Sequence, residues 1–411
     1  MSAIFNRPSA RRFFDSEFLL LGFVLFMAMA GFISIAISQM CLGISLLLLL
    51  YRRGVRKVPL PRTGLELGAL LLAAWALLNI FFSTDVQTSI IFYRRFFLFS
   101  AIWVVAAVIN TEHRRFLFLL SGLIGALAIS LFGEIQSVIQ TGSLFTDRFG
   151  AMSNPMTSGS LLMMMLLVGM GFLLAGGHRR WFLVILPLVL LPVLLGTVLT
   201  MTRSVLLGVA GGIGVMVLLS HRRWFFAFLL LLLVLVILVL ALGESILPAR
   251  LYGRMNLDYL VSGRNTVVRL EMWQGAWEMV KAKPIFGFGD RNLLTLVPEY
   301  YGDSATNYYG HMHSNFVQLA VIWGIPGLFL GLFFIFMPLI LLVRRWKDSL
   351  GLASHLPVQT GWILGAIGMW TGFFLAGFTE WYFGDAETML IYLAFLGCAL
   401  APSLSKPKQP I

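Results

Sequence analysis

The sequence has little of what soluble enzymes and thiolate metal sites are built from. Only 12% of its 411 residues are charged and only two are cysteines, whereas 59% are hydrophobic. This scarcity of charge excludes an ordinary soluble domain. Cys41 and Cys398 both lie in long apolar runs. We expect them to be small packing residues, which leaves neither a disulfide nor a thiolate metal site.

Several familiar catalytic patterns are also missing from the sequence. It contains no nucleophilic serine motif, P-loop, dinucleotide fingerprint or paired-carboxylate pattern. We find no internal repeat and no low-complexity linker, so we expect one membrane domain over residues 1–411.

Apolar runs long enough to cross a bilayer, about 20 residues each, recur along almost the whole chain. The sequence therefore predicts an all-α, polytopic membrane protein of about 12 transmembrane helices. Residues 18–50 are too long for one span and predict two helices; an alternative is a cleaved signal peptide, since Ala28-Met29-Ala30 resembles a cleavage site. The other ten spans are expected at 64–82, 90–109, 116–133, 158–175, 181–198, 204–219, 224–242, 326–343, 360–378 and 387–401.

The net charge of +12 could indicate a nucleic-acid ligand, but its distribution argues against one. Nearly two thirds of the 30 Lys and Arg residues fall in the termini and short loops of one side, as the positive-inside rule predicts for cytoplasmic segments. The even number of spans then places both termini in the cytoplasm. We expect no nucleic-acid partner.

The remaining basic residues lie outside those loops, where topology gives them no role. They are Arg94, Arg95, Arg148, Arg203, Arg250, Arg254, Arg264, Arg269, Lys281, Lys283 and Arg291. Nearly all are arginines, whose planar guanidinium suits two-point binding of phosphate oxygens. This pattern predicts a polyanionic ligand on the external side.

Arg203 is the most distinctive of these arginines. The segment Thr200-Met201-Thr202-Arg203-Ser204 is the only polar break in the apolar residues 181–219. An ionisable group at membrane depth is costly and is a functional candidate by default. The alternative is an arginine that extends from a tight external turn to the headgroups.

Three further external arginine sites have ordinary explanations as well as a phosphate-binding one. Arg94 and Arg95 begin a span, where one could bind phosphate and the other lipid headgroups; Arg148 could pair with Asp147. Arg291 follows a glycine-rich turn, Gly287-Phe288-Gly289-Asp290, which by itself indicates a turn more than a phosphate cradle.

Residues 243–325 form the one long interruption between apolar runs, and we expect an external catalytic loop with short interfacial helices, which the family resemblance described below would make periplasmic. Residues 264–284 predict such a helix, with Met272, Trp273, Ala276, Trp277 and Val280 at helical spacing and Pro284 at the end. Arg269 would share that face, at the level of a lipid-linked phosphate, and Arg264 would add a contact. A cation-π contact of Arg269 with Trp273 is an alternative.

His311 and His313 supply the candidate acid–base chemistry. Ser314 or Asn315 is expected to open a helix, which would place His313 at its N-terminus and favour a neutral imidazole that accepts a proton. A metal held by His311, His313 and Glu299 or Asp303 is an alternative, as is a purely structural histidine. We expect no metal and no cofactor.

Three motifs in this region resemble those of the O-antigen ligase family, which has a shared ligase and polymerase domain. One runs from His313-Ser314 through nine residues to Gly324-Ile325-Pro326-Gly327; one is Arg269 and Trp273, followed by Pro-x-x-Gly-x-Gly at 284–289; the third is Thr202-Arg203 at the outer end of a span. The family often has Thr-x-Ser-Arg where this chain has 200–203 as Thr-Met-Thr-Arg. The resemblance covers the topology of the whole chain and the motifs of residues 200–327.

This resemblance implies a multi-pass protein of the inner membrane of a Gram-negative bacterium, with a GT-C-like fold and a periplasmic active site. It implies a metal-independent, inverting glycosyltransferase that moves preassembled O-antigen polysaccharide from undecaprenyl diphosphate to the lipid A core in lipopolysaccharide assembly. The expected partners are this donor, this acceptor and membrane lipids. By the same resemblance, His313 would act as base or orient the acceptor, and Arg203 and Arg269 would bind the diphosphate.

Other functions fit part of the pattern. An O-antigen polymerase or a protein O-oligosaccharyltransferase would share the donor and the histidine motif, although the latter proteins tend to be longer. A lipid-linked glycan transporter would place polar groups at the midplane of spans in both halves, whereas here they gather on one side. A purely structural membrane protein would leave the external arginines without a role.

Overall fold

The computed structural model describes residues 16–145, 148–151, 153–176, 180–255, 263–296, 299–300, 310–350 and 356–402. Over these residues the regular structure is helical, with no strand, which confirms the all-α expectation. Both cysteines are buried thiols, as expected of packing residues.

Nine helical segments of the described chain are long and apolar enough to cross a membrane. They are α3 (Ile35–Arg56), the continuous run of α5 (Val86–Tyr93), η1 (Arg94–Phe99) and α6 (Ser100–Val108), α7 (Glu112–Thr141), α8 (Pro155–Ala175), α9 (Arg180–Leu199), α10 (Arg203–Ser220), α11 (Arg222–Ile246), α16 (Asn315–Ser349) and α17 (Pro357–Ala376). Three shorter apolar helices are α2 (Ser16–Ala30), α4 (Glu66–Ile80) and α18 (Ala386–Ala399). Each coincides with an expected span, and the chain is a multi-pass membrane protein.

The centre of the bundle is formed by α8, α10 and α17, which approach closely through glycines. A Cβ at Gly171 of α8 would meet the backbone of Gly365 of α17, and a Cβ at Gly208 of α10 would lie 2.9 Å from the Gly372 carbonyl oxygen of α17. Small residues at such crossings let helix backbones pack directly in a membrane protein. The candidate functional site described below is built on the ends of these closely packed helices.

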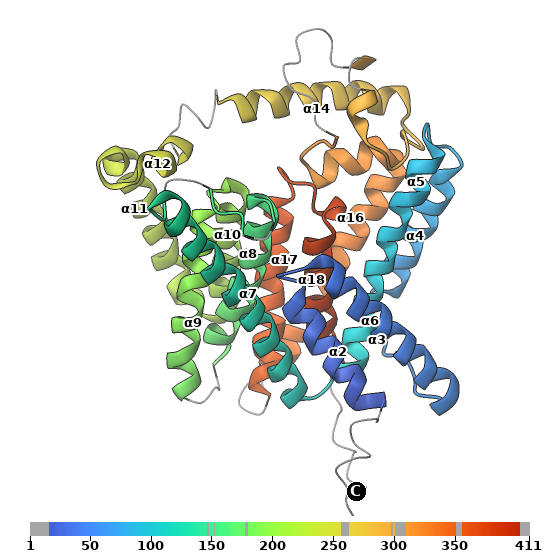
Figure 1. Cartoon of the computed structure of the whole chain (residues 1–411), viewed down its shortest axis with the longest axis horizontal. Helices are drawn as coiled ribbons and strands as arrows, with labels where there is room; N and C mark the ends of the chain where they lie inside the picture. Colours follow the sequence, from blue (N-terminus) through green and yellow to red (C-terminus); the bar gives the residue numbers. More distant parts are fainter. Residues whose placement is uncertain are drawn as a thin grey trace, which may run out of the picture.

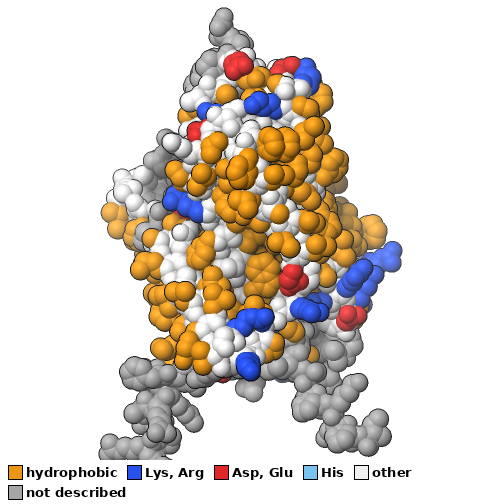
Figure 2. Space-filling view, turned by 90° about the vertical axis from the view of Figure 1, so that its right-hand side faces the viewer, with side chains coloured by type: hydrophobic (Ala, Val, Ile, Leu, Met, Phe, Trp, Pro, Cys, Tyr) orange, Lys and Arg blue, Asp and Glu red, His pale blue; other side chains and the backbone are white. Residues whose placement is uncertain are grey.

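One end of the bundle is covered by α14 (Arg264–Ala282), which lies across the ends of the other helices (Figure 1). We call this the α14 end. The face shown in Figure 2 is covered by hydrophobic side chains over its middle, and charged side chains gather mainly towards its two ends. This distribution is that of a protein surrounded by lipid.

The helix expected at 264–284 is confirmed as α14, which ends just before Pro284. Its inner face, Met272, Ala276 and Met279, packs in a small core with Phe288 and Met312. Trp277, grouped by spacing with this stripe, is instead 62% exposed. The apolar stripe of α14 therefore rests partly on protein, and this contact fixes the position of Arg269 on the same helix.

Helix α16 begins at Asn315, as expected, but is broken at Gly324, whose φ of 69° and ψ of −175° interrupt the helix. The break leaves carbonyl oxygens without their helical partners. Val321 O accepts from Phe288 N at 2.9 Å, Ile322 O accepts from Gly289 N at 2.9 Å, and Trp323 O accepts from Trp75 Nε1 at 3.0 Å.

The two glycine motifs therefore bind each other. Ile325 N, also released by the break, donates to Pro284 O at 2.8 Å. A Cβ at Gly324 would lie 2.8 Å from that same Pro284 oxygen, and Gly287 and Gly289 both have positive φ, of 63° and 87°. The Pro284–Gly289 loop is thus a brace that holds the α16 break against the end of α14, and the amides of Gly287, Phe288 and Gly289 all donate to main-chain carbonyl groups.

Candidate functional site

The segment His311–Asn315, which leads into α16, is fixed from several sides. Met312 N donates to Gln318 Oε1 at 2.7 Å, and Met312 O accepts from Trp273 Nε1 of α14 at 2.9 Å. Ser314 is the N-cap of α16, and its side chain accepts from Val317 N at 3.4 Å. Trp273 of the Arg-x-x-x-Trp motif thus positions the histidine turn.

Asn315 connects this turn to the loop between α17 and α18. Its main-chain N donates to Gly377 O at 2.8 Å, and its side-chain Oδ1 accepts from Tyr382 N at 2.7 Å. Tyr382 begins the short helix η3 (Tyr382–Gly384). The loop that carries Glu380 is therefore held against the start of α16.

His313 is buried and adopts φ of 46°, a left-handed conformation that is uncommon for residues other than glycine. Its ring centroid lies 4.2 Å from that of His311, and its main-chain N donates to His311 Nδ1 at 3.3 Å. Because Nδ1 of His311 accepts a hydrogen bond, the neutral His311 ring carries its proton on Nε2. The surrounding structure holds His313 in an otherwise unfavourable backbone conformation, as is common at functional sites.

Both histidines are neutral at physiological pH. Burial, followed by the charges of His311 and Arg269, lowers the pKa of His313 to about 3. Burial, followed by the charges of Arg269 and Arg95, also lowers the pKa of His311. The pKa of about 3 keeps the His313 imidazole neutral through burial, and it also makes this ring a weak proton acceptor.

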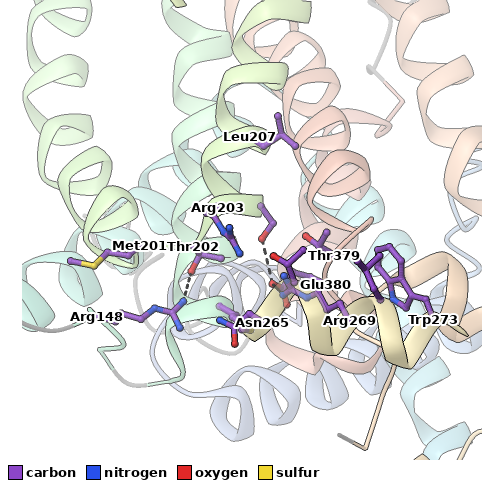
Figure 3. Close-up of a pocket in the computed structure, with 14 residues that line it drawn as sticks. Arg148, Met201, Thr202, Arg203, Leu207, Asn265, Arg269, Trp273, Thr379 and Glu380 are labelled. Carbon is purple, nitrogen blue, oxygen red and sulfur yellow. Dashed lines mark hydrogen bonds and ion pairs between the residues drawn. The ribbon is translucent and has the colours of Figure 1, made fainter. Parts of the chain in front are cut away.

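A cavity of about 420 Å³ opens beside this turn at the α14 end (Figure 3). Three arginines from three elements line it: Arg148 from the α7–α8 connection, Arg203 from the first residue of α10 and Arg269 from α14. The other lining residues include Glu380, Trp273 and Leu207. We call this the arginine cavity.

Arg148 and Arg203 are positioned by the turn between α9 and α10. Arg148 Nε donates to Thr200 O at 3.0 Å, and its Nη2 donates to Thr202 Oγ1 at 2.9 Å. Met201 at the centre of this turn has φ of 49°, and Arg203 follows it at the start of α10. Arg203 therefore lies at a tight turn, as in the alternative considered above, yet its side chain lines the cavity.

Arg269 pairs with Glu380, a residue for which the sequence predicted no role. Arg269 Nη2 lies 3.4 Å from Glu380 Oε1, and Ser204 Oγ donates to the same oxygen at 3.4 Å. Glu380 is 5% exposed, and burial raises its pKa to about 7 although Arg269 and Ser204 oppose the shift. A carboxyl group with this pKa can take up and release a proton near neutral pH.

A second cavity, of about 390 Å³, adjoins the first, and the two share Glu380 and Met156. Its other lining residues are Ser153, Asn154, Thr157, His311, Trp381, Tyr382, Gly384, Asp385, Ala386 and Glu387. We call this the acidic cavity. His311 lines it directly, whereas His313 lines neither of the two cavities.

Three of the arginines proposed from sequence lie elsewhere. Arg95 Nη1 pairs with the buried Asp290 at 3.1 Å and stacks on Phe92 at 4.2 Å from the ring centroid. Arg291 donates to Thr84 Oγ1 at 2.8 Å and to Thr295 Oγ1 at 2.7 Å. Arg94 is exposed at the start of η1. None of the three lines either cavity.

Some of the other residues proposed from sequence lie outside the part of the chain that the structure describes. Arg264 is the first residue of α14, but its side chain, like Asp147 and Asp303, lies outside what the structure describes. Within the described chain, no three His, Cys, Asp or Glu residues are grouped as a metal site would require.

Sequence reasoning did not single out Glu380, Trp381, Asp385 or Glu387. They follow the span at 360–378 directly, on the side of the membrane where the unexplained arginines lie. The sequence signal that could have identified them is an acidic residue at the end of an apolar span, on the same side of the membrane as a group of arginines.

Residues 188–332 match the family model described as O-Antigen ligase. This stretch contains Arg203, Arg269, His313 and both glycine motifs, and the match confirms the resemblance that those residues suggested. No curated protein matches the chain.

Proposed function

We propose that this chain, whose residues 188–332 match the O-antigen ligase family model, is a member of that family and transfers a preassembled O-antigen glycan from undecaprenyl diphosphate to a lipid A core. The reaction would take place on the periplasmic side of the inner membrane, at the α14 end. The observation that carries the proposal is the arginine cavity, which is lined by Arg148, Arg203 and Arg269 and by the buried carboxyl group of Glu380, whose pKa is raised to about 7.

The arginine cavity suits a diphosphate. Guanidinium groups only donate hydrogen bonds, so a cavity lined by Arg148, Arg203 and Arg269 favours a ligand rich in acceptors. A charge-assisted hydrogen bond contributes about 1.5 to 3 kcal/mol, so two or three of them would offset much of the charge that develops on the leaving diphosphate. Their strength would grow during the reaction, because charge moves from the glycosidic bond onto the diphosphate oxygens.

In the transfer step, the oxygen of the acceptor hydroxyl attacks the anomeric carbon of the donor sugar. The bond from that carbon to the diphosphate oxygen breaks, its electron pair leaves with undecaprenyl diphosphate, and the configuration at the anomeric carbon is inverted. The hydroxyl proton passes to a protein base. Glu380, in the wall shared by the two cavities, is better matched to this role than His313, whose pKa is about 3.

His313 would then orient the acceptor rather than take its proton. Its ring contacts His311, which lines the acidic cavity, and both rings are neutral. We propose that His311, positioned by its contact with His313, holds the acceptor hydroxyl by a hydrogen bond while Glu380 accepts the proton.

Purified protein in lipid nanodiscs, supplied with undecaprenyl-diphosphate-linked glycan and lipid A core, tests the proposal. We expect transfer in the presence of chelator, and loss of transfer in His313→Ala and in Arg203→Ala. His221→Ala, at an exposed histidine, should retain activity. Lengthening of the donor glycan without transfer to the core would replace the ligase by a polymerase, and movement of donor across the membrane without any transfer would refute both.

A further inference from the structure

The two adjoining cavities have opposite chemical character. The arginine cavity is lined by Arg148, Arg203 and Arg269, whereas the acidic cavity is lined by Glu380, Asp385 and Glu387 and by no Lys or Arg among the described residues. Glu380 belongs to both. A ligand in the arginine cavity and a ligand in the acidic cavity would therefore both contact Glu380.

The hydrogen-bonding groups define what the acidic cavity can bind. Ionised carboxylates are acceptors only, so a complementary ligand must supply donors such as hydroxyl or ammonium groups. A phosphate placed there would be repelled by each of the carboxyl groups of Glu380, Asp385 and Glu387 that is ionised, and the cavity offers no Lys or Arg among the described residues to offset that repulsion. The diphosphate is thus confined to the arginine cavity, and the acidic cavity is left for a ligand rich in hydroxyls.

The remaining walls fit a sugar ring. Trp381 supplies an apolar ring surface, and Asn154 and His311 supply polar groups that both accept and donate. The volume of about 390 Å³ falls within the range of small-molecule pockets, roughly 300 to 1,000 Å³. A few directed polar groups beside an aromatic surface are typical of such pockets.

Hydrogen bonds hold the acidic side chains of this cavity in place. Asp385 is the N-cap of α18 and accepts from Thr388 N, and its Oδ2 accepts from Thr157 Oγ1 of α8 at 2.6 Å. Glu387 follows in the first turn of α18 and is half-buried. The carboxylates thus project from one helix start, which is itself joined to α8.

We propose that the acidic cavity binds the terminal sugar of the acceptor, a hexose or amino-hexose without phosphate on that ring, with one hydroxyl directed to Glu380. This inference rests on the proposed function and adds the acceptor subsite to it. The arginine cavity holds the departing diphosphate on the other side of the same carboxylate, so donor and acceptor approach Glu380 from opposite directions.

Two variants test the subsite through steady-state kinetics. Glu387→Gln keeps the shape but replaces the carboxyl group by an amide, and Ala386→Phe fills the cavity. Each should raise the KM for the acceptor about tenfold or more and leave the KM for the donor unchanged. The matched control, Leu207→Phe in the arginine cavity, should raise the donor KM and leave the acceptor KM unchanged. A rise in donor KM for Glu387→Gln, or an unchanged acceptor KM for both variants, overturns the assignment.

A binding measurement separates this inference from the transfer reaction. Calorimetry without donor would use the delipidated core oligosaccharide, in one form with an unmodified terminal hexose and in another with that hexose phosphorylated. We expect binding of the unmodified form alone, and weaker binding to Glu387→Gln. Equal binding of both forms refutes the subsite. If binding instead required added Mg²⁺ and vanished in chelator, a cation site would replace it.

The two proposals fail in distinguishable ways. Absence of transfer by the wild-type protein, with selective sugar binding intact, would refute the ligase but retain the sugar subsite. Transfer that proceeds normally in Glu387→Gln and Ala386→Phe would retain the ligase and refute the subsite. Thermal unfolding of each variant in the same nanodiscs identifies any loss that is due to misfolding.

Discussion

Glu380 Oε1 lies 3.4 Å from Arg269 Nη2 and 3.4 Å from Ser204 Oγ, so one buried carboxyl group joins α14 and α10 to the loop between α17 and α18. Removing either partner of a buried ion pair leaves the other charge uncompensated. The same carboxyl group forms part of both cavities. Substitutions here should therefore affect chemistry and local packing together, and the predictions below separate the two.

The first prediction concerns the pH dependence of transfer. The raised pKa of Glu380, about 7, means that the carboxylate needed as a base forms only as pH rises through that value. We expect kcat to increase with pH and to level off above about 8. Glu380→Gln should lower kcat at least 100-fold and abolish this rise. Glu278→Gln, at an exposed carboxylate of α14, is the control. An unchanged pH profile in Glu380→Gln would assign the titration to another group.

The second prediction concerns the three arginines of the first cavity. Arg148→Lys, Arg203→Lys and Arg269→Lys keep the charge but lose the two-point geometry, so each should raise the donor KM or lower kcat roughly 10- to 100-fold. Arg94→Lys, at an exposed arginine outside the cavity, should have no effect. Equal sensitivity of position 94 and position 203 in a donor titration would contradict a specific diphosphate site.

The third prediction concerns the glycine brace. Gly324→Ala places a side chain at φ of 69° and directs its Cβ at the carbonyl groups of Pro284 and Ile285. We expect a loss of about 2 kcal/mol or more of stability, seen as a lower Tm, together with reduced transfer. Gly22→Ala, whose Cβ would meet nothing within 4 Å, should be neutral or slightly stabilising. A Tm for Gly324→Ala equal to that of the wild type would mean that the brace is dispensable.

The fourth prediction concerns acid stability. The pKa of His313 is about 3 in the folded protein and about 6.5 when unfolded, so the folded state binds fewer protons below pH 6.5. The free energy of unfolding is therefore highest above pH 6.5 and decreases as the pH falls from 6.5 towards 3. At pH 5 the decrease due to His313 amounts to about 2 kcal/mol.

Tm measurements between pH 7.5 and pH 5 test this linkage. His313→Asn should show a smaller fall in Tm than the wild type over this range, because it carries no proton-binding ring. His221→Asn, at an exposed histidine, should behave as the wild type does. An identical fall in all three proteins would show that His313 does not titrate in this way.

The helices could be predicted from sequence because lipid imposes a simple rule on length and polarity. Each expected span has a counterpart, and the connector between α2 and α3 is only a few residues long. The helix at 264–282 and the start of α16 at Asn315 were likewise predicted from periodicity and capping. These features depend on residues close together in the chain.

The site could be predicted only in part, because its contacts join distant segments. Sequence grouped Arg94, Arg95 and Arg291 with Arg203 and Arg269 by charge and side of the membrane alone. The structure instead pairs Arg95 with Asp290 and brings Arg148 beside Arg203. Glu380 was one acid among several until folding placed it against Arg269. Such pairings depend on helix packing, which residue spacing does not encode.

The break in helix α16 constrains the number of residues between the histidine turn at its start and Gly324. Residues 315–323 form the helical segment between the histidine turn and the break at Gly324. An α-helix turns by about 100° and advances by about 1.5 Å per residue. One inserted or deleted residue would therefore rotate the histidine turn by about 100° relative to the break at Gly324, while Ile325 N stayed bound to Pro284 O. The length of this short segment, independent of what its side chains are, sets the direction in which the histidine turn faces.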